Sequence, residues 1–83
     1  MTPWKVEWTG AAQKDLLTLD ASTLARVRAA LCRLAETGEG DVKKLHGLPG
    51  YRLRVGSWRV FFLRDSSLRT LRLFRVKPRK DAD

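Results

Sequence analysis

The sequence predicts a single α+β domain in which a two-helix hairpin packs on one face of a mainly antiparallel four-stranded sheet, in the order β-α-α-β-β-β. Three observations predict this class. An alternating apolar and charged run opens the chain, two helical apolar patterns follow, and three short β-prone runs occupy the C-terminal half. With 83 residues the chain forms one domain, 1–83, and residues 77–83 are a candidate disordered tail.

The first element is a predicted strand over residues 4–8, WKVEW. Its three apolar side chains, Trp4, Val6 and Trp8, alternate with charged ones, which is the period of a half-buried strand. The spacing of apolar residues then becomes helical, and Thr9 is a candidate N-cap for a first helix.

A second helix follows, for which Asp20 or Ser22 is the candidate N-cap. Its apolar residues recur with helical spacing and predict a core-facing stripe: Leu24, Val27, Leu31, Leu34 and Ala35. The helix is expected to end near Gly38, a residue suited to left-handed backbone geometry.

The C-terminal half is expected to begin with a loop and to continue as a three-stranded meander. The loop is KKLHGLPG, residues 43–50, and the predicted strands cover 51–55, 58–64 and 68–76. Gly56-Ser57 is a pair favoured in two-residue hairpin turns. The later DSS segment, which begins at Asp65, also has turn composition.

The two hairpin turns predict which side chains share the face opposite the core. A two-residue turn at Gly56-Ser57 places Arg54 directly opposite Arg59. By the same rule, a turn at Ser66-Ser67 places Phe61 opposite Arg72 and Arg59 opposite Phe74. On the core face it places Phe62 opposite Leu71. The predicted second face is basic with aromatic rings between the charges, and it contains Arg52, Arg54, Arg59, Phe61, Arg72 and Phe74.

Such a face suits a phosphate-bearing ligand. Arginine forks bind phosphate through two hydrogen bonds, and phenyl rings offer stacking surfaces for unpaired bases. The alternative is a solvated sheet face on which the arginine stems cover Phe61 and Phe74.

Charge is distributed unevenly along the chain. The formal net charge is +8, yet residues 1–41 hold five basic and six acidic residues, against twelve basic and three acidic in 42–83. This asymmetry favours a polyanionic partner, with a solubilising surface as the alternative. The single cysteine excludes an internal disulfide, and no metal or cofactor motif is visible. Neither a signal peptide nor a membrane span is indicated, so a cytoplasmic location is expected.

The motif KKL.G...YRLRVG..RV and the terminal VKPRK, in this order of elements, resemble the RelE/ParE superfamily of bacterial toxins, in particular its RelE-like branch. The resemblance extends from WKVEWT to PRK. It implies a toxin that a cognate antitoxin protein neutralises, with a toxin–antitoxin complex on operator DNA as a further expectation. RelE-type members act on mRNA in the ribosome, whereas ParE members poison DNA gyrase.

The resemblance also implies site residues. Basic residues of RelE-like nucleases match Arg52, Arg54 and Arg59, a C-terminal arginine matches Arg79, and His46 stands at a basic position of the loop motif. We expect Arg54, Arg59, Arg79 and His46 to be catalytic. The expected RNA-binding residues are Arg52, Lys43, Lys44, Phe61, Arg72 and Phe74.

Two departures from the family pattern bear on the chemistry: the best-known pattern has lysines where this chain has Arg52 and Arg54, and the usual C-terminal tyrosine is missing. Many members carry a tyrosine about four residues after the terminal arginine, where this chain has Asp83. Arginine is a poor general base because its pKa exceeds ~12, so another group must move the proton. His46 is the only imidazole, and its alternative interpretation is a solvent-exposed loop residue. Lys43 and Lys44 have the same alternative.

The leading hypothesis is therefore a ribosome-dependent mRNA endoribonuclease that cuts RNA by attack of a 2′-hydroxyl on the adjacent phosphate. The alternatives are a ParE-like gyrase inhibitor and a degenerate toxin that binds antitoxin and RNA without cleavage.

Overall fold

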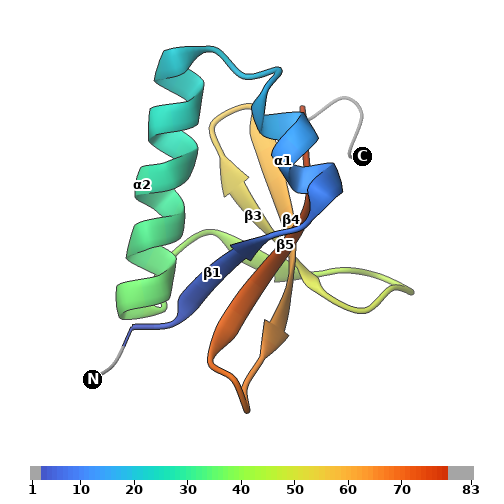
Figure 1. Cartoon of the computed structure of the whole chain (residues 1–83). Helices are drawn as coiled ribbons and strands as arrows, with labels where there is room; N and C mark the ends of the chain where they lie inside the picture. The colour runs from blue at the N-terminus through green and yellow to red at the C-terminus, as the bar shows by residue number, and fades with distance from the viewer. Residues whose placement is uncertain (1–2, 79–83) are drawn as a thin grey trace.

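The chain folds as one strand, two helices and four further strands (Figure 1). The computed structural model describes residues 3–78. The elements are β1 (Lys5–Trp8), α1 (Gly10–Leu16), α2 (Ala21–Thr37), β2 (Val42–Lys44), β3 (Tyr51–Val55), β4 (Trp58–Asp65) and β5 (Thr70–Pro78). The strands form a single sheet in the order β1-β5-β4-β3-β2, in which only the β1–β5 pair is parallel. The predicted α+β class is confirmed.

Both helices begin at the predicted caps. The Thr9 hydroxyl accepts a hydrogen bond from the Ala12 amide at 3.3 Å, and the Asp20 carboxylate accepts one from the Thr23 amide at 2.9 Å. Helix α2 ends at Gly38, whose φ of 76° is in the left-handed region, as its sequence position predicts. None of the helices in the described part of the chain is long and apolar enough to cross a membrane.

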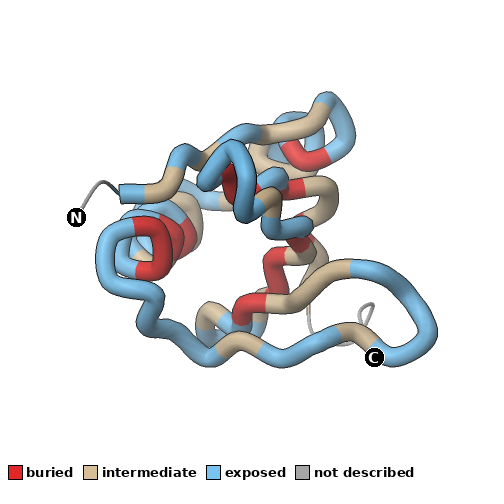
Figure 2. The backbone as a smooth tube through the Cα atoms, turned by 90° about the horizontal axis from the view of Figure 1, so that it is seen from below, coloured by how far each residue is buried: buried red, intermediate tan, exposed pale blue. Residues whose placement is uncertain are grey.

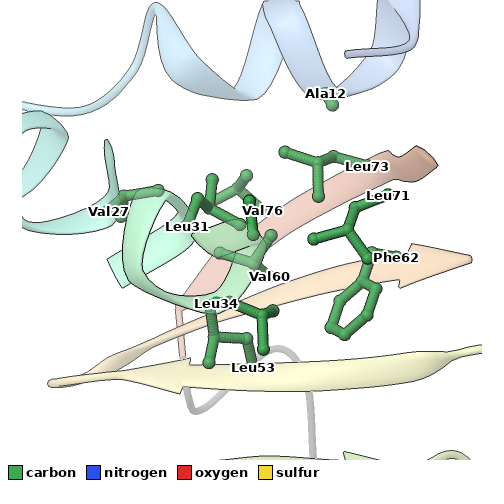
Figure 3. Close-up of a cluster of buried hydrophobic side chains, with 11 residues drawn as sticks. Ala12, Val27, Leu31, Leu34, Leu53, Val60, Phe62, Leu71, Leu73 and Val76 are labelled. Carbon is green, nitrogen blue, oxygen red and sulfur yellow. The ribbon is translucent and has the colours of Figure 1, made fainter. Parts of the chain in front are cut away.

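The core lies between the two helices and one face of the sheet, which is called the inner face below. Figure 2 shows buried positions on α2 and on the strands that it covers, and Figure 3 shows the side chains that meet there. The buried hydrophobic residues are Ala12, Val27, Leu31, Leu34, Ala35, Leu53, Val60, Phe62, Leu71, Leu73 and Val76. The opposite face of the sheet, the outer face, carries no helix and is left to present the charged side chains.

The sheet has five strands where the sequence indicates four. The additional strand is β2, which pairs antiparallel with β3 within the segment predicted to be a loop. It is only three residues long, two of them lysines, so neither hydrophobic alternation nor β-propensity marks it. Lysines on a short edge strand also discourage pairing with other chains.

The β3–β4 hairpin has the predicted register. Gly56 adopts a φ of 59°, which a two-residue turn of this kind requires and which glycine accepts without steric cost. Arg54 lies opposite Arg59, and Arg52 lies opposite Phe61.

The β4–β5 register differs from the prediction. Phe62 pairs with Leu73, two residues beyond the predicted Leu71, because the turn spans residues 66–69 and not two serines. The Asp65 carboxylate stabilises this longer turn by accepting a hydrogen bond from the Leu68 amide at 3.1 Å. A register shift between Phe61 and Phe62 then adds one more residue on β5, at 74, so Arg59 lies opposite Lys77.

Strand β5 is also longer than predicted. Lys77 and Pro78, the first two residues of the candidate tail, belong to β5, and residues 79–83 lie outside the described part of the chain. Strand β1 pairs with β5 only as far as Leu73.

Helix α1 supplies the partner where β1 no longer reaches. The Asp15 carboxylate accepts hydrogen bonds from the Val76 amide at 2.8 Å and from Arg75 Nε at 2.9 Å. Burial raises the pKa of Asp15, but the hydrogen bonds from Arg75 and Val76 more than offset this and leave the pKa below its usual value.

Candidate nucleic-acid interface

Four strands place charged side chains in one row across the outer face. The Arg54 amide donates to the Asp41 carbonyl at 3.0 Å, which sets Asp41 beside Arg54 just before β2 begins. Arg54 lies opposite Arg59, and Arg59 lies opposite Lys77. Because directly opposed residues of antiparallel strands share a face, the row reads Asp41, Arg54, Arg59 and Lys77.

A second row runs parallel to the first and is more apolar toward β5. Lys43 lies opposite Arg52, and Arg52 lies opposite Phe61. The Phe61 ring is half-buried and lies 6.2 Å from the Phe74 ring, centroid to centroid. The basic part of the surface therefore adjoins an aromatic pair, as predicted, although Phe74 occupies the bulge and does not face Arg59.

The two rows enclose a small hollow, called the arginine pocket below. Its volume is about 30 Å³, and it is lined by Asp41, Lys43, Arg52, Arg54 and Arg59. This is far below the ~300–1,000 Å³ of typical small-molecule pockets. A nucleotide chain would therefore lie across the mouth of the pocket and not inside it.

Arg54 and Arg59 of the arginine pocket differ in their exposure to solvent. Arg59 is only 6% exposed, whereas Arg54 is exposed to solvent. Two like charges directly opposite each other on a sheet repel by a few tenths to ~1 kcal/mol. An anion between the strands would convert this repulsion into attraction. Four of the five described residues that line the pocket are cationic, and this favours an anionic ligand.

The remaining predicted site residues lie apart from the pocket. Arg72 was predicted to lie opposite Phe61, but it lies opposite Leu63 and outside the two arginine rows. Its Nε is 3.2 Å from a Glu7 carboxylate oxygen on β1. Lys44 lies opposite Tyr51, whose side chain belongs to the inner face.

His46 and Arg79 are not brought to the pocket either. His46 is exposed in the loop between β2 and β3 and does not line the pocket. Arg79 lies outside the described residues. Within residues 3–78, the side chains of His, Cys, Asp and Glu form no cluster of three that could hold a metal ion.

Sequence reasoning missed two residues of the surface, Asp41 and Lys77. Asp41 becomes visible once Val42–Lys44 is read as a strand paired with β3, because the next residue back must then adjoin Arg54. Lys77 is displaced by the four-residue turn and the bulge. Neither feature has a strong sequence signal, since the bulge has no glycine and the turn has no proline.

Fold and site together define the class of protein: a small α+β domain with a helix-free basic sheet face, as in the RelE/ParE superfamily of type II toxins. The sequence model of the ParE toxin of the type II toxin–antitoxin system parDE matches residues 6–82. The chain belongs to this family. No curated protein matches the sequence.

Solved structures agree with this assignment. The chain is similar to a protein of the RelBE2 toxin–antitoxin complex of Mycobacterium tuberculosis, with 27% identity, a TM-score of 0.83, and coverage of 94% of this chain and 100% of that one. It is also similar to a chain of the archaeal RelE–RelB complex of Pyrococcus horikoshii, with 24% identity, a TM-score of 0.78, and coverage of 94% and 97%. For the intact RelBE complex of E. coli these values are 17%, 0.78, 90% and 95%, which shows a shared fold.

Proposed function

We propose that this toxin is a ribosome-dependent mRNA endoribonuclease of the RelE type. The observation that carries the proposal is the direct opposition of Arg54 and Arg59 in a pocket with Lys43 and Arg52. An anion bound between the two strands would be attracted by both guanidinium groups, and a polyanionic backbone fits the basic lining of the pocket and the helix-free sheet face.

The proposed chemistry needs positive charge at a phosphate and a group that takes the proton of the 2′-hydroxyl. The ribose 2′-oxygen attacks the adjacent phosphorus, the bond from phosphorus to the 5′-oxygen breaks, and a 2′,3′-cyclic phosphate and a 5′-hydroxyl result. Negative charge gathers on the nonbridging oxygens during this step. Removing one donor that stabilises such charge commonly costs ~10²–10³ in rate. Arg59, held by burial, and Arg54, at the pocket mouth, suit this role.

The aromatic pair suits the base beside that phosphate. Phe61 and Phe74 flank the basic rows, and their rings are partly exposed. Stacking of one base on an aromatic side chain is worth ~1–3 kcal/mol and tolerates any base. We expect Phe61 to contribute more to this stacking than Phe74, because Phe61 shares a row with Arg52.

Control by a cognate antitoxin is part of the proposal. The similar structures from M. tuberculosis, P. horikoshii and E. coli are toxin–antitoxin complexes. We expect this chain to bind a small antitoxin in the same manner, to be cytoplasmic, and to form a toxin–antitoxin complex that contacts operator DNA.

The second candidate function is inhibition of DNA gyrase. The match to the ParE family model favours it, because ParE toxins resemble this chain in sequence over residues 6–82. A third candidate is a toxin that binds antitoxin and RNA without cleavage, which is favoured by Asp83 at the position of the usual C-terminal tyrosine.

One experiment separates the three candidates. The purified protein is added to a translating extract, and mRNA ends are mapped by primer extension with analysis of the terminal phosphate. In parallel it is added to gyrase and supercoiled DNA. Cuts in phase with codons that end in 2′,3′-cyclic phosphate support the nuclease. Gyrase-dependent DNA breaks with intact mRNA would replace it with the second candidate, and no effect in either assay would leave the third.

A further inference from the structure

We propose that the carboxylate of Asp41 recognises the 2′-hydroxyl of an RNA strand lying on the arginine pocket and accepts its proton during cleavage. This inference rests on the proposed nuclease function for its chemical step. Its binding step, selection of RNA over DNA, is tested independently of cleavage.

Asp41 differs from every other carboxylate in residues 3–78. Six of the seven carboxylates have a hydrogen-bond or ion-pair partner among these residues. Glu7 contacts Arg72, Asp15 contacts Arg75 and Val76, Asp20 caps α2, Glu36 accepts from Cys32, Glu39 contacts Arg33, and Asp65 holds the β4–β5 turn. The Asp41 carboxylate makes no hydrogen bond or ion pair with any residue in the described range, although its backbone carbonyl bonds to Arg54.

Asp41 lines the arginine pocket, and the other described residues that line it are all cationic. Lys43 on β2, Arg52 and Arg54 on β3, and Arg59 on β4 surround it, and Lys77 on β5 ends its row. A site built only to bind phosphate gains nothing from a negative charge there, because the carboxylate repels the ligand. The acid is useful if the ligand presents a hydrogen-bond donor next to its phosphate, and the ribose 2′-hydroxyl is that donor in RNA.

Among the described residues that line the pocket, Asp41 is also the one suited to take a proton. Arginine stays protonated at all ordinary pH values, and lysine side chains are ordinarily protonated at neutral pH. Carboxylates are ordinarily ionised at neutral pH and can act as general bases. His46 does not line the pocket.

The step balances without a co-reactant. The 2′-oxygen forms its bond to phosphorus as its proton passes to the Asp41 carboxylate. The 5′-oxygen leaves and takes a proton from solvent, and Asp41 returns its proton to solvent. No metal ion, oxidant or second substrate is needed.

Three variants separate recognition from proton transfer. Asp41→Ala removes both the acceptor and the base, and Asp41→Asn keeps an acceptor oxygen but cannot hold the proton. Glu39→Gln is the matched control, because it removes the same charge two residues away, outside the pocket. Asp41 is exposed and its side chain has no partner in the described range, so we expect all three proteins to fold, with Tm as the check.

The first measurement is binding of a short single-stranded RNA and of the DNA of the same sequence at one salt concentration. We expect wild type and Glu39→Gln to prefer RNA by roughly tenfold, as a hydrogen bond to a charged group allows. Asp41→Ala should lose this preference, while its overall affinity for both strands stays equal or rises. Equal RNA and DNA binding by wild type, or a preference that persists in Asp41→Ala, would overturn the inference.

The second measurement is the rate of mRNA cleavage on translating ribosomes. We expect Asp41→Asn to lower it ~10²–10⁴-fold, the range typical of a general base, with Glu39→Gln near wild type. Cleavage by Asp41→Asn at the wild-type rate would overturn the proton-transfer role while leaving the nuclease function standing. A wild type that prefers RNA through Asp41 without cutting it would overturn both the nuclease function and the proton-transfer role, and would support recognition alone.

Discussion

Arg54 and Arg59 lie directly opposite each other on neighbouring strands, on the one face of the sheet that no helix covers. One is exposed and the other is 6% exposed, so the pair combines a mobile guanidinium with a fixed one. Like charges in this position weaken a sheet. We therefore expect removal of the Arg54 charge to leave stability unchanged or raise it, and to weaken the binding of an anionic ligand.

The first prediction concerns stability without ligand. Arg54→Gln keeps a polar side chain and removes its charge, so the unfolding free energy should stay unchanged or rise, by no more than about 1 kcal/mol. Urea unfolding at low and at high salt measures this. Added salt should reduce the difference in unfolding free energy between wild type and Arg54→Gln, because the repulsion is between charges near the surface. A clear loss of stability would show that Arg54 serves the fold.

The second prediction concerns salt. If the outer face binds the backbone of a single RNA strand, log affinity should fall linearly with log salt, with a slope of about −0.7 for each phosphate neutralised. Arg54→Gln should make the slope less steep by about 0.7. Arg28→Gln, on the exposed side of α2, should leave it unchanged. Equal slopes for all three proteins would place the RNA elsewhere.

The third prediction concerns acid stability. The pKa of Asp15 is lowered in the folded protein, so its contribution is fully present above the ordinary value of 3.8 and is lost as pH falls through the lowered value. Asp15→Asn should cost about 1–2 kcal/mol at pH 7, since Arg75 and Val76 lose a charged acceptor. The difference between the two proteins should shrink below pH 3.8. Urea unfolding measures this, and a difference in unfolding free energy between wild type and Asp15→Asn that stays constant down to pH 2 would contradict the prediction.

The fourth prediction concerns the core. Phe62 is 1% exposed and stacks on Tyr51 at 5.7 Å between ring centroids. Phe62→Ala should therefore cost about 3–5 kcal/mol, a large part of the ~5–15 kcal/mol that holds a domain of this kind. Leu68→Ala is the control, because Leu68 is 61% exposed, and it should change the unfolding free energy by less than ~0.5 kcal/mol. A comparable loss in both variants would mean that the core is assigned incorrectly.

The sequence was sufficient for the parts of the fold that local chemistry determines. Thr9, Asp20 and Gly38 bound the helices because capping depends on one residue and its nearest amides. The β3–β4 register followed from Gly56, because a two-residue turn leaves no freedom in the pairing. These predictions required no knowledge of the tertiary structure.

The features that were predicted incorrectly depend on contacts between residues that are distant in sequence. Strand β2 exists because β3 offers it an edge, and its own composition does not favour a strand. The β4–β5 register depends on a turn held by Asp65 and on a bulge at Phe74. The longer turn moves Arg72 out of the arginine rows, and the turn and the bulge together place Lys77 opposite Arg59. Asp41 was not predicted as a site residue for the same reason, because only its pairing with Arg54 brings it to the pocket.

The most direct test of the central claim is cleavage of mRNA by three proteins on translating ribosomes: wild type, Arg54→Gln and Arg28→Gln. The account predicts codon-phased cuts by wild type and by Arg28→Gln, and a rate at least 10²-fold lower for Arg54→Gln. Equal cleavage by Arg54→Gln and Arg28→Gln would contradict the assignment of the arginine pocket as the place where the phosphate is held.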